Sequence, residues 1–139
     1  MKRILLSVVW LAVWAGAVGC KTTDTGAYLP QNTNQSNQEA TANFVLLDPG
    51  AAHSVTHAGL SERALPDGRL EVTANVRNRE NRRIEVQINC VFKDANWVPT
   101  GDETPFESLI LTENGITVVR FVSTNDKARK YTIRVRQSR

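Results

Sequence analysis

The chain is 139 residues long, which is enough for one domain of ordinary size and no more. Its formal net charge is +3, from 17 basic and 14 acidic residues, but Lys2 and Arg3 belong to a predicted signal peptide. Removing these two leaves 15 basic and 14 acidic residues, a balance of +1. A nucleic-acid-binding protein would need a strong excess of Lys and Arg for its phosphate contacts, so this composition excludes that class.

The N-terminal residues 1–19 have the features of a secretory signal. Lys2 and Arg3 form a positively charged start, and the run from Ile4 to Val18 is apolar or small at every position except Ser7. This run is shorter than the roughly 20 apolar residues that cross a bilayer, and no later segment approaches that length. We therefore expect residues 1–19 to be removed on export.

Cys20 stands where a bacterial lipoprotein is modified. The segment Ala17-Val18-Gly19-Cys20 resembles a lipobox, in which the cysteine thiolate accepts a diacylglycerol and the signal is cut before it. Two or three acyl chains, at about 0.8 kcal/mol per buried methylene, would hold the protein permanently in a membrane. Because Lys21 rather than Asp follows the cysteine, we expect anchoring at the periplasmic face of the outer membrane, with inner-membrane anchoring as the alternative.

A second cleavage site gives a different expectation. Ala15-Gly16-Ala17 matches the A-x-A pattern, and cleavage after Ala17 would release a soluble secreted protein with a free Cys20. In an oxidising compartment that thiol could form a disulfide with Cys90, whereas a lipidated Cys20 leaves Cys90 alone.

Residues 20–43 contain the lipidated cysteine and a polar segment rich in Thr, Asn, Gln and Ser. Such a segment cannot bury enough apolar surface to offset the entropy that it would lose on ordering, so we predict a disordered, flexible tether. We expect the folded domain to cover residues 44–139.

The predicted domain begins with two strands. Phe44–Leu47 is a short apolar run that ends at the turn residues Asp48-Pro49-Gly50, and a second strand covers Val55–Ala64. Pro66-Asp67-Gly68 is then a strong turn signal, because Pro restricts its own φ and Gly accepts positive φ.

The clearest alternation of apolar and polar residues covers Leu70–Arg77 and Ile84–Lys93, and its period of two is that of a half-buried strand. A polar connection, residues 78–83, joins these strands, so we predict an antiparallel hairpin.

Three more strands are predicted in the C-terminal half, at Phe106–Leu111, Ile116–Ser123 and Tyr131–Arg136, with one helical turn at Asn125–Arg129. About seven short antiparallel strands and no convincing amphipathic helix predict an all-β fold, an immunoglobulin-like β-sandwich.

The ordered motifs of this domain resemble the YcfL-like periplasmic lipoproteins, whose domain is largely of unknown function. The motifs are Gly68-x-Leu70-x-Val72-x-Ala74-x-Val76-x-Asn78, Phe92-x-Asp94-Ala95, Pro105-Phe106 with Leu109-x-Leu111, and Ala128-Arg129-x-Tyr131-x-Ile133-x-Val135-Arg136. The resemblance covers roughly residues 44–136, beyond the lipobox. It implies a β-sandwich lipoprotein and transfers no catalytic residue to this chain.

Residues capable of catalysis or metal binding lie in unsuitable contexts. Cys90 falls in register with inward apolar positions, so we expect a core residue rather than a nucleophile. His53 and His57 have no Cys or paired carboxylate nearby, and the serines lie in no nucleophile motif. We therefore expect no enzyme, no metal site and no cofactor.

Arginine clusters and one aromatic residue form the candidate interaction surface. The candidates are Arg77, Arg79, Arg82 and Arg83 around the predicted hairpin tip, Arg134 and Arg136 on the last strand, and Trp97. Arg pairs bidentately with carboxylate and phosphate, which favours an anionic envelope component or an acidic protein surface; the alternative is that these charges protect exposed strand edges. Trp97, the only tryptophan of the processed chain, either stacks on a sugar or closes the end of the sandwich.

These expectations combine into one function. The protein is expected to be a non-enzymatic interaction or assembly module of the cell envelope, held at the outer membrane by its lipid anchor and bound to an envelope protein. The alternative is a module that binds peptidoglycan or another glycan. No nucleic-acid partner is expected.

Overall fold

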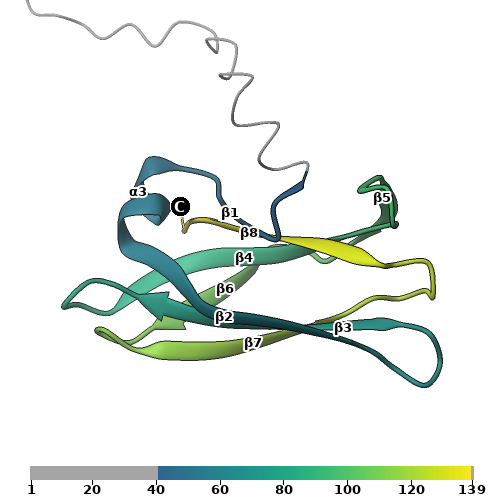
Figure 1. Ribbon diagram of the computed structural model, residues 1–139. Coiled ribbons are helices and arrows are strands. Elements are labelled where there is room, and N and C mark those ends of the chain that lie inside the picture. The colour runs from purple at the N-terminus through teal and green to yellow at the C-terminus, as the bar shows by residue number, and fades with distance from the viewer. Residues whose placement is uncertain (1–40, 139) are drawn as a thin grey trace, which may run out of the picture. The chain divides into compact units, whose positions relative to one another are not determined.

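The computed structural model describes residues 41–138, which form a β-sandwich (Figure 1). The predicted signal peptide, Cys20 and most of the predicted tether lie outside these residues. The elements are β1 (Phe44–Leu46), α3 (Pro49–Ser54), β2 (Val55–Ala64), β3 (Leu70–Asn78), β4 (Ile84–Lys93), β5 (Pro99–Glu103), β6 (Glu107–Leu111), β7 (Ile116–Val122) and β8 (Lys130–Gln137). No helix within residues 41–138 has the length and apolar content that crossing a membrane requires.

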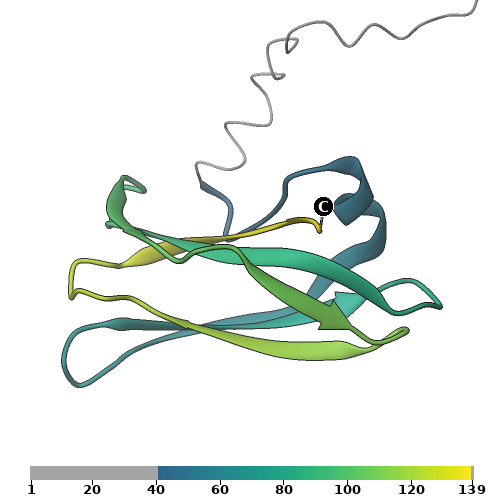
Figure 2. The ribbon, with the colours of Figure 1, turned by 180° about the vertical axis from the view of Figure 1, so that it is seen from behind.

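The strands form two layers, one above the other in both ribbon views (Figures 1 and 2). The larger sheet has the order β1-β8-β4-β5, and β6 pairs with the other end of β4. The smaller sheet has the order β2-β3-β7. This arrangement confirms the predicted all-β sandwich, with eight strands in the described domain rather than about seven.

The core lies between the sheets and is built from the alternating positions that the sequence predicts. Its buried side chains include Val72, Ala74 and Val76 of β3, Ile88, Cys90 and Phe92 of β4, Phe121 of β7, and Ile133 and Val135 of β8. At about 25 cal/mol per Å² of apolar surface removed from water, this layer is the main stabilising contribution to the fold.

The predicted hairpin of β3 and β4 is wrong. β3 pairs with β2 and β7, whereas β4 pairs with β5, β6 and β8, so residues 79–83 cross from one sheet to the other. The side chain of Asn78 fixes this crossing: its Nδ2 donates to the carbonyls of Arg82 (2.7 Å) and Thr112 (2.9 Å), and its Oδ1 accepts from Glu80 N (2.9 Å). The alternation of apolar and polar residues indicates which face of a strand is buried, but not which strand pairs with it. β3 and β4 therefore keep their alternation although they lie in different sheets.

Two local predictions also need correction. β1 pairs with β8 in parallel, with Phe44 beside Ile133, so the strands are not all antiparallel. The predicted turn after Leu47 is instead the start of α3, because Asp48 Oδ1 accepts from Ala51 N (2.8 Å) and caps the helix, and Pro49 tolerates its first position.

No helical turn forms between β7 and β8. Residues 125–129 are bends and irregular backbone, and the hydroxyl of buried Ser123 donates to Asn125 O (2.8 Å) while it accepts from Leu70 N (2.9 Å). The side chain of Ser123 therefore ties the Asn125 carbonyl of this connection to the start of β3 at Leu70.

Candidate interaction surfaces

Cys90 lies fully buried on the inner face of β4, as predicted for a core residue. Burial, reinforced by the negative charge of Asp102, raises the pKa of this thiol far above its ordinary value. Because the thiolate is the nucleophilic form, Cys90 is unreactive at neutral pH.

The two predicted histidines lie in different surroundings. His53 is exposed in the last turn of α3, whereas the His57 ring on β2 lies 5.0 Å from the Phe44 ring, measured between centroids. Among residues 41–138, no group of three or more His, Cys, Asp or Glu is arranged to hold a metal ion.

Ser54 does not form a nucleophile site in this arrangement. Its hydroxyl donates to the carboxylate of Glu80, which also pairs with Arg82. The hydrogen bonds from Arg82 and then from Ser54 lower the pKa of Glu80, and a carboxylate with a lowered pKa is a weak base. The three side chains fix the β3–β4 connection against α3.

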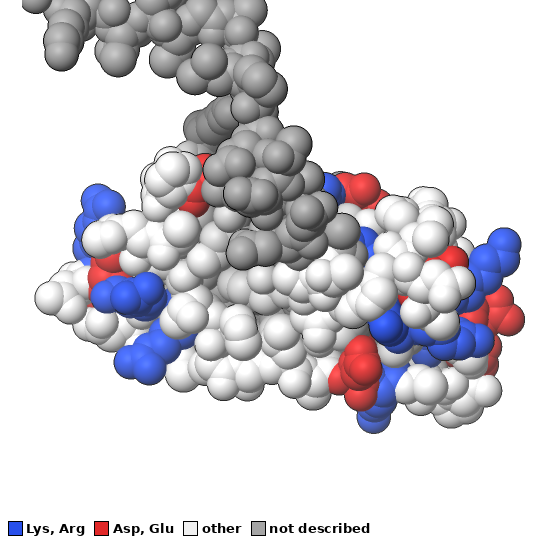
Figure 3. All heavy atoms as spheres, turned by 45° about the horizontal axis from the view of Figure 1, so that its top comes forward, with Lys and Arg blue, Asp and Glu red and all other residues white. Residues whose placement is uncertain are grey.

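Arg79, Arg82 and Arg83 lie on the β3–β4 connection at one end of the sandwich. Arg82 and Arg83 line a cavity of about 340 Å³, together with Gly50 of α3, Glu85 of β4 and Gln137 of β8. On the face drawn in Figure 3, Lys and Arg side chains gather at the two ends of the described domain. Arg77 lies apart from this cavity, on the outer face of β3 beside Ile116 of β7.

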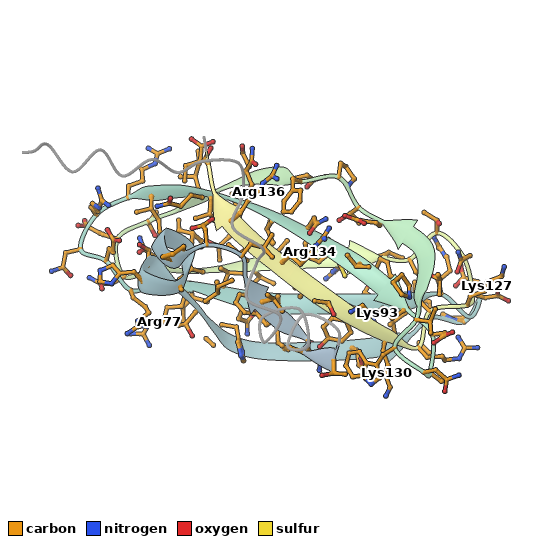
Figure 4. All side chains as sticks on the ribbon, turned by 90° about the horizontal axis from the view of Figure 1, so that it is seen from above. Arg77, Lys93, Lys127, Lys130, Arg134 and Arg136 are labelled. Carbon is orange, nitrogen blue, oxygen red and sulfur yellow. The ribbon has the colours of Figure 1, made fainter. Side chains whose placement is uncertain are left out.

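Arg134 and Arg136 point outward from β8 on the larger sheet (Figure 4). Their guanidinium carbons lie 5.4 Å and 3.8 Å from the centroid of the Phe106 ring, which is the geometry of a cation–π contact. Arg134 also pairs with Glu103 and donates to Asn89 Oδ1 (3.0 Å), and Arg136 donates to Gln87 Oε1 (2.8 Å).

Edge protection does not explain these two arginines. β8 lies between β1 and β4, so Arg134 and Arg136 are on an interior strand of the larger sheet. Both arginines donate hydrogen bonds to side chains of the neighbouring strand β4. These bonds stabilise the outer face of the larger sheet, and the arginines do not cover an open edge.

Trp97 lies in the turn between β4 and β5 and is half-buried. Two ammonium groups lie over its indole ring: Lys130 Nζ at 4.5 Å and Lys93 Nζ at 5.8 Å from the ring centroid. The sequence predicts Trp97 as a candidate but not this association, because Lys93 and Lys130 meet only through the pairing of β4 with β8.

The outer face of β7 is a surface that the sequence analysis missed. Ile116 and Val118 are 55% and 64% exposed, and β7 is the last strand of the smaller sheet. Arg77 lies beside Ile116 in the cross-strand register, and Arg120 follows Val118 at the next outward position. The sequence does contain a sign of this surface, because β7 has apolar residues at both odd and even positions. A strand with one face in water needs apolar residues only at the alternate positions that face the core.

Comparison with solved structures finds the same fold in two bacterial proteins. The crystal structure of Campylobacter jejuni cj0090 aligns with a TM-score of 0.56 over 69% of this chain and 98% of that chain, at 13% sequence identity. A DUF1425 family member from Shewanella sp. pv-4 aligns with a TM-score of 0.56 over 67% of this chain and 87% of that chain, at 23% identity. No family model and no curated protein matches the sequence. The protein thus shares its β-sandwich fold with these two bacterial proteins.

Proposed function

We propose that this protein is a YcfL-like lipoprotein, anchored through a lipidated Cys20 at the periplasmic face of the outer membrane. Its β-sandwich is a non-enzymatic module that docks envelope proteins. Two independent lines support the family assignment: the ordered motifs of residues 68–136, and the fold shared with a DUF1425 family member. The docking role is supported by the edge of the smaller sheet.

The edge strand β7 offers both backbone and apolar contacts to a partner. On the side away from β3, every second N–H and C=O of an edge strand faces outward, and within residues 41–138 no strand pairs with β7 on that side. Ile116 and Val118 present exposed apolar side chains on the outer face of the same strand. An edge with this composition is suited to the addition of an extended segment from another protein.

The charges near this edge indicate the chemistry of the partner. Glu71 already pairs with Arg63 at 2.7 Å, whereas the Nε of Arg120 is 4.0 Å from the second carboxylate oxygen of Glu71. Arg120 and Arg77 are both exposed beside the apolar pair. The partner segment is therefore extended, with apolar side chains against Ile116 and Val118 and an acidic side chain near Arg120.

Site-specific photo-cross-linking in intact cells tests the docking surface. A photoreactive amino acid replaces Val118, and the matched control replaces Ser61, an exposed outward residue on β2 at the opposite edge of the same sheet. We expect a discrete protein adduct from position 118 that is absent from position 61. No adduct at position 118, or the same adduct from both positions, would contradict the docking proposal.

The anchoring part of the proposal has its own test. The intact mass of the purified protein should equal the chain from Cys20 plus its acyl groups, and Cys20→Ser should leave the outer-membrane fraction. A mass equal to the unmodified chain from Val18 would contradict lipidation and reopen a disulfide between Cys20 and Cys90.

A further inference from the structure

A cavity of about 340 Å³ lies at one end of the sandwich, where α3, the β3–β4 connection and the last residues of β8 meet. Both ribbon views show α3 beside the end of β8 (Figures 1 and 2). Asp48 fixes these two elements to each other, because its Oδ1 caps α3 and its Oδ2 accepts from Gln137 N (2.7 Å). Arg79 N donates to Ser54 O (2.8 Å), which fixes the connection to the other end of α3. Hydrogen bonds within the fold therefore hold the walls of the cavity in place.

The cavity combines an apolar floor with a charged rim. Its floor consists of the buried lining residues, Ala51 of α3 and Val86 of β4. Arg83 and Glu85 also line the cavity, and both residues are exposed, so the cavity is accessible to a ligand from solvent. Its volume is at the small end of the range for ligand-binding pockets, which combine apolar surface with a few polar groups. The cavity is therefore suited to a small molecule.

The rim carries one positive and one negative charge that the described residues do not compensate. Arg82, which also lines the cavity, pairs with Glu80. Within residues 41–138, the guanidinium of Arg83 forms no hydrogen bond and no ion pair. The carboxylate of Glu85 forms no ion pair within the same residues, and it accepts a hydrogen bond from Ser138 Oγ (3.3 Å). The cavity thus offers one guanidinium and one carboxylate to a ligand.

We propose that this cavity binds a free α-amino acid with an apolar side chain. The guanidinium of Arg83 donates to the ligand carboxylate, and the carboxylate of Glu85 accepts from the ligand ammonium group. The apolar side chain of the ligand lies on the floor of the cavity. A ligand that is only an anion would be repelled by Glu85, and a ligand that is only a cation would be repelled by Arg83, so the rim favours a zwitterion. This site shares no residue with the β7 surface and adds a second binding function to the docking role.

Isothermal titration calorimetry on the full chain in a non-ionic detergent tests this assignment with three matched probes. L-leucine carries both charges, L-leucinamide lacks the carboxylate, and 4-methylpentanoate lacks the ammonium group. At about pH 6.5 the amino groups of leucine and of its amide are both protonated, and both carboxylic acids are ionised. We expect leucine to bind about tenfold more tightly than either analogue, the scale of one charge-assisted contact. No measurable binding of leucine, or equal affinity for the three probes, would overturn the assignment.

Two variants identify the groups that recognise each charge. Arg83→Gln should bind leucine and leucinamide equally, and Glu85→Gln should bind leucine and 4-methylpentanoate equally. The matched control is Arg79→Gln, an exposed arginine of the same connection that lines a neighbouring groove instead of this cavity, and it should keep both preferences. Both preferences retained in Arg83→Gln and Glu85→Gln, or lost equally in Arg79→Gln, would also overturn the assignment.

Folding and docking are separated from this test. Arg83 and Glu85 are exposed, so each variant should keep the melting temperature of the unmutated protein within a few degrees. The comparison of the three probes uses the unmutated protein and does not depend on how the variants fold. The cross-linking result at Val118 does not depend on these probes or variants, so the two proposals fail separately.

Discussion

Replacing Asn78 with alanine is expected to destabilise the domain more than any other change at a single polar side chain of β3. Asn78 is fully buried where β3 ends, and it bonds to Arg82 O, Thr112 O and Glu80 N at 2.7–2.9 Å. Its removal leaves these three backbone groups without the side chain that pairs them. At about 1 kcal/mol for each net hydrogen bond, the expected loss is about 3 kcal/mol.

Thermal and urea unfolding followed by circular dichroism measures this loss. For a domain of this size, about 3 kcal/mol corresponds to a fall of about 12–24 °C in melting temperature. The matched control is Asn75→Ala, a half-buried residue on the outer face of the same strand, which should change stability by less than about 0.5 kcal/mol. A loss below about 1 kcal/mol for Asn78→Ala, or an equal loss for Asn75→Ala, would refute the role of Asn78 in fixing the crossing between sheets.

Three further predictions concern acid stability, thiol reactivity and one turn. Hydrogen bonding from Arg63 lowers the pKa of Glu71 below its ordinary value, so this pair stabilises the fold fully above that ordinary value. The contribution is lost as the pH falls through the lower pKa of the folded state, so Glu71→Gln should flatten the decline in melting temperature on acidification. Cys90 should resist iodoacetamide at about pH 8 and react once urea unfolds the chain. Peptide mass analysis measures the labelling, and labelling of Cys90 in the folded protein would contradict its burial. Gly68→Ala, at φ +86°, should cost about 1–2 kcal/mol in urea unfolding, whereas Gly59→Ala, whose added Cβ meets its nearest atom at 3.5 Å, should cost clearly less.

Strand positions were predictable from the sequence because the period of two is a property of the local backbone. Val55–Ala64 was predicted with the bounds that the structure has, and the alternation in Leu70–Arg77 and Ile84–Lys93 identified the core-facing residues of β3 and β4. It did not predict that Glu71, Asn89 and Lys93, on the opposite faces of these strands, are buried as well. The burial of Cys90 followed from the same register. Each of these predictions needs only residues close together in the chain.

Strand pairing was decided by the tertiary structure. β3 and β4 are neighbours in sequence but lie in different sheets, and β1 finds its parallel partner in β8 at the far end of the chain. The approach of Lys93 to Lys130 over Trp97, and the exposure of Ile116 and Val118 at an edge, follow from that pairing. A strand's own sequence determines which of its faces is buried, whereas its neighbours are chosen by how two sheets bury all such faces together.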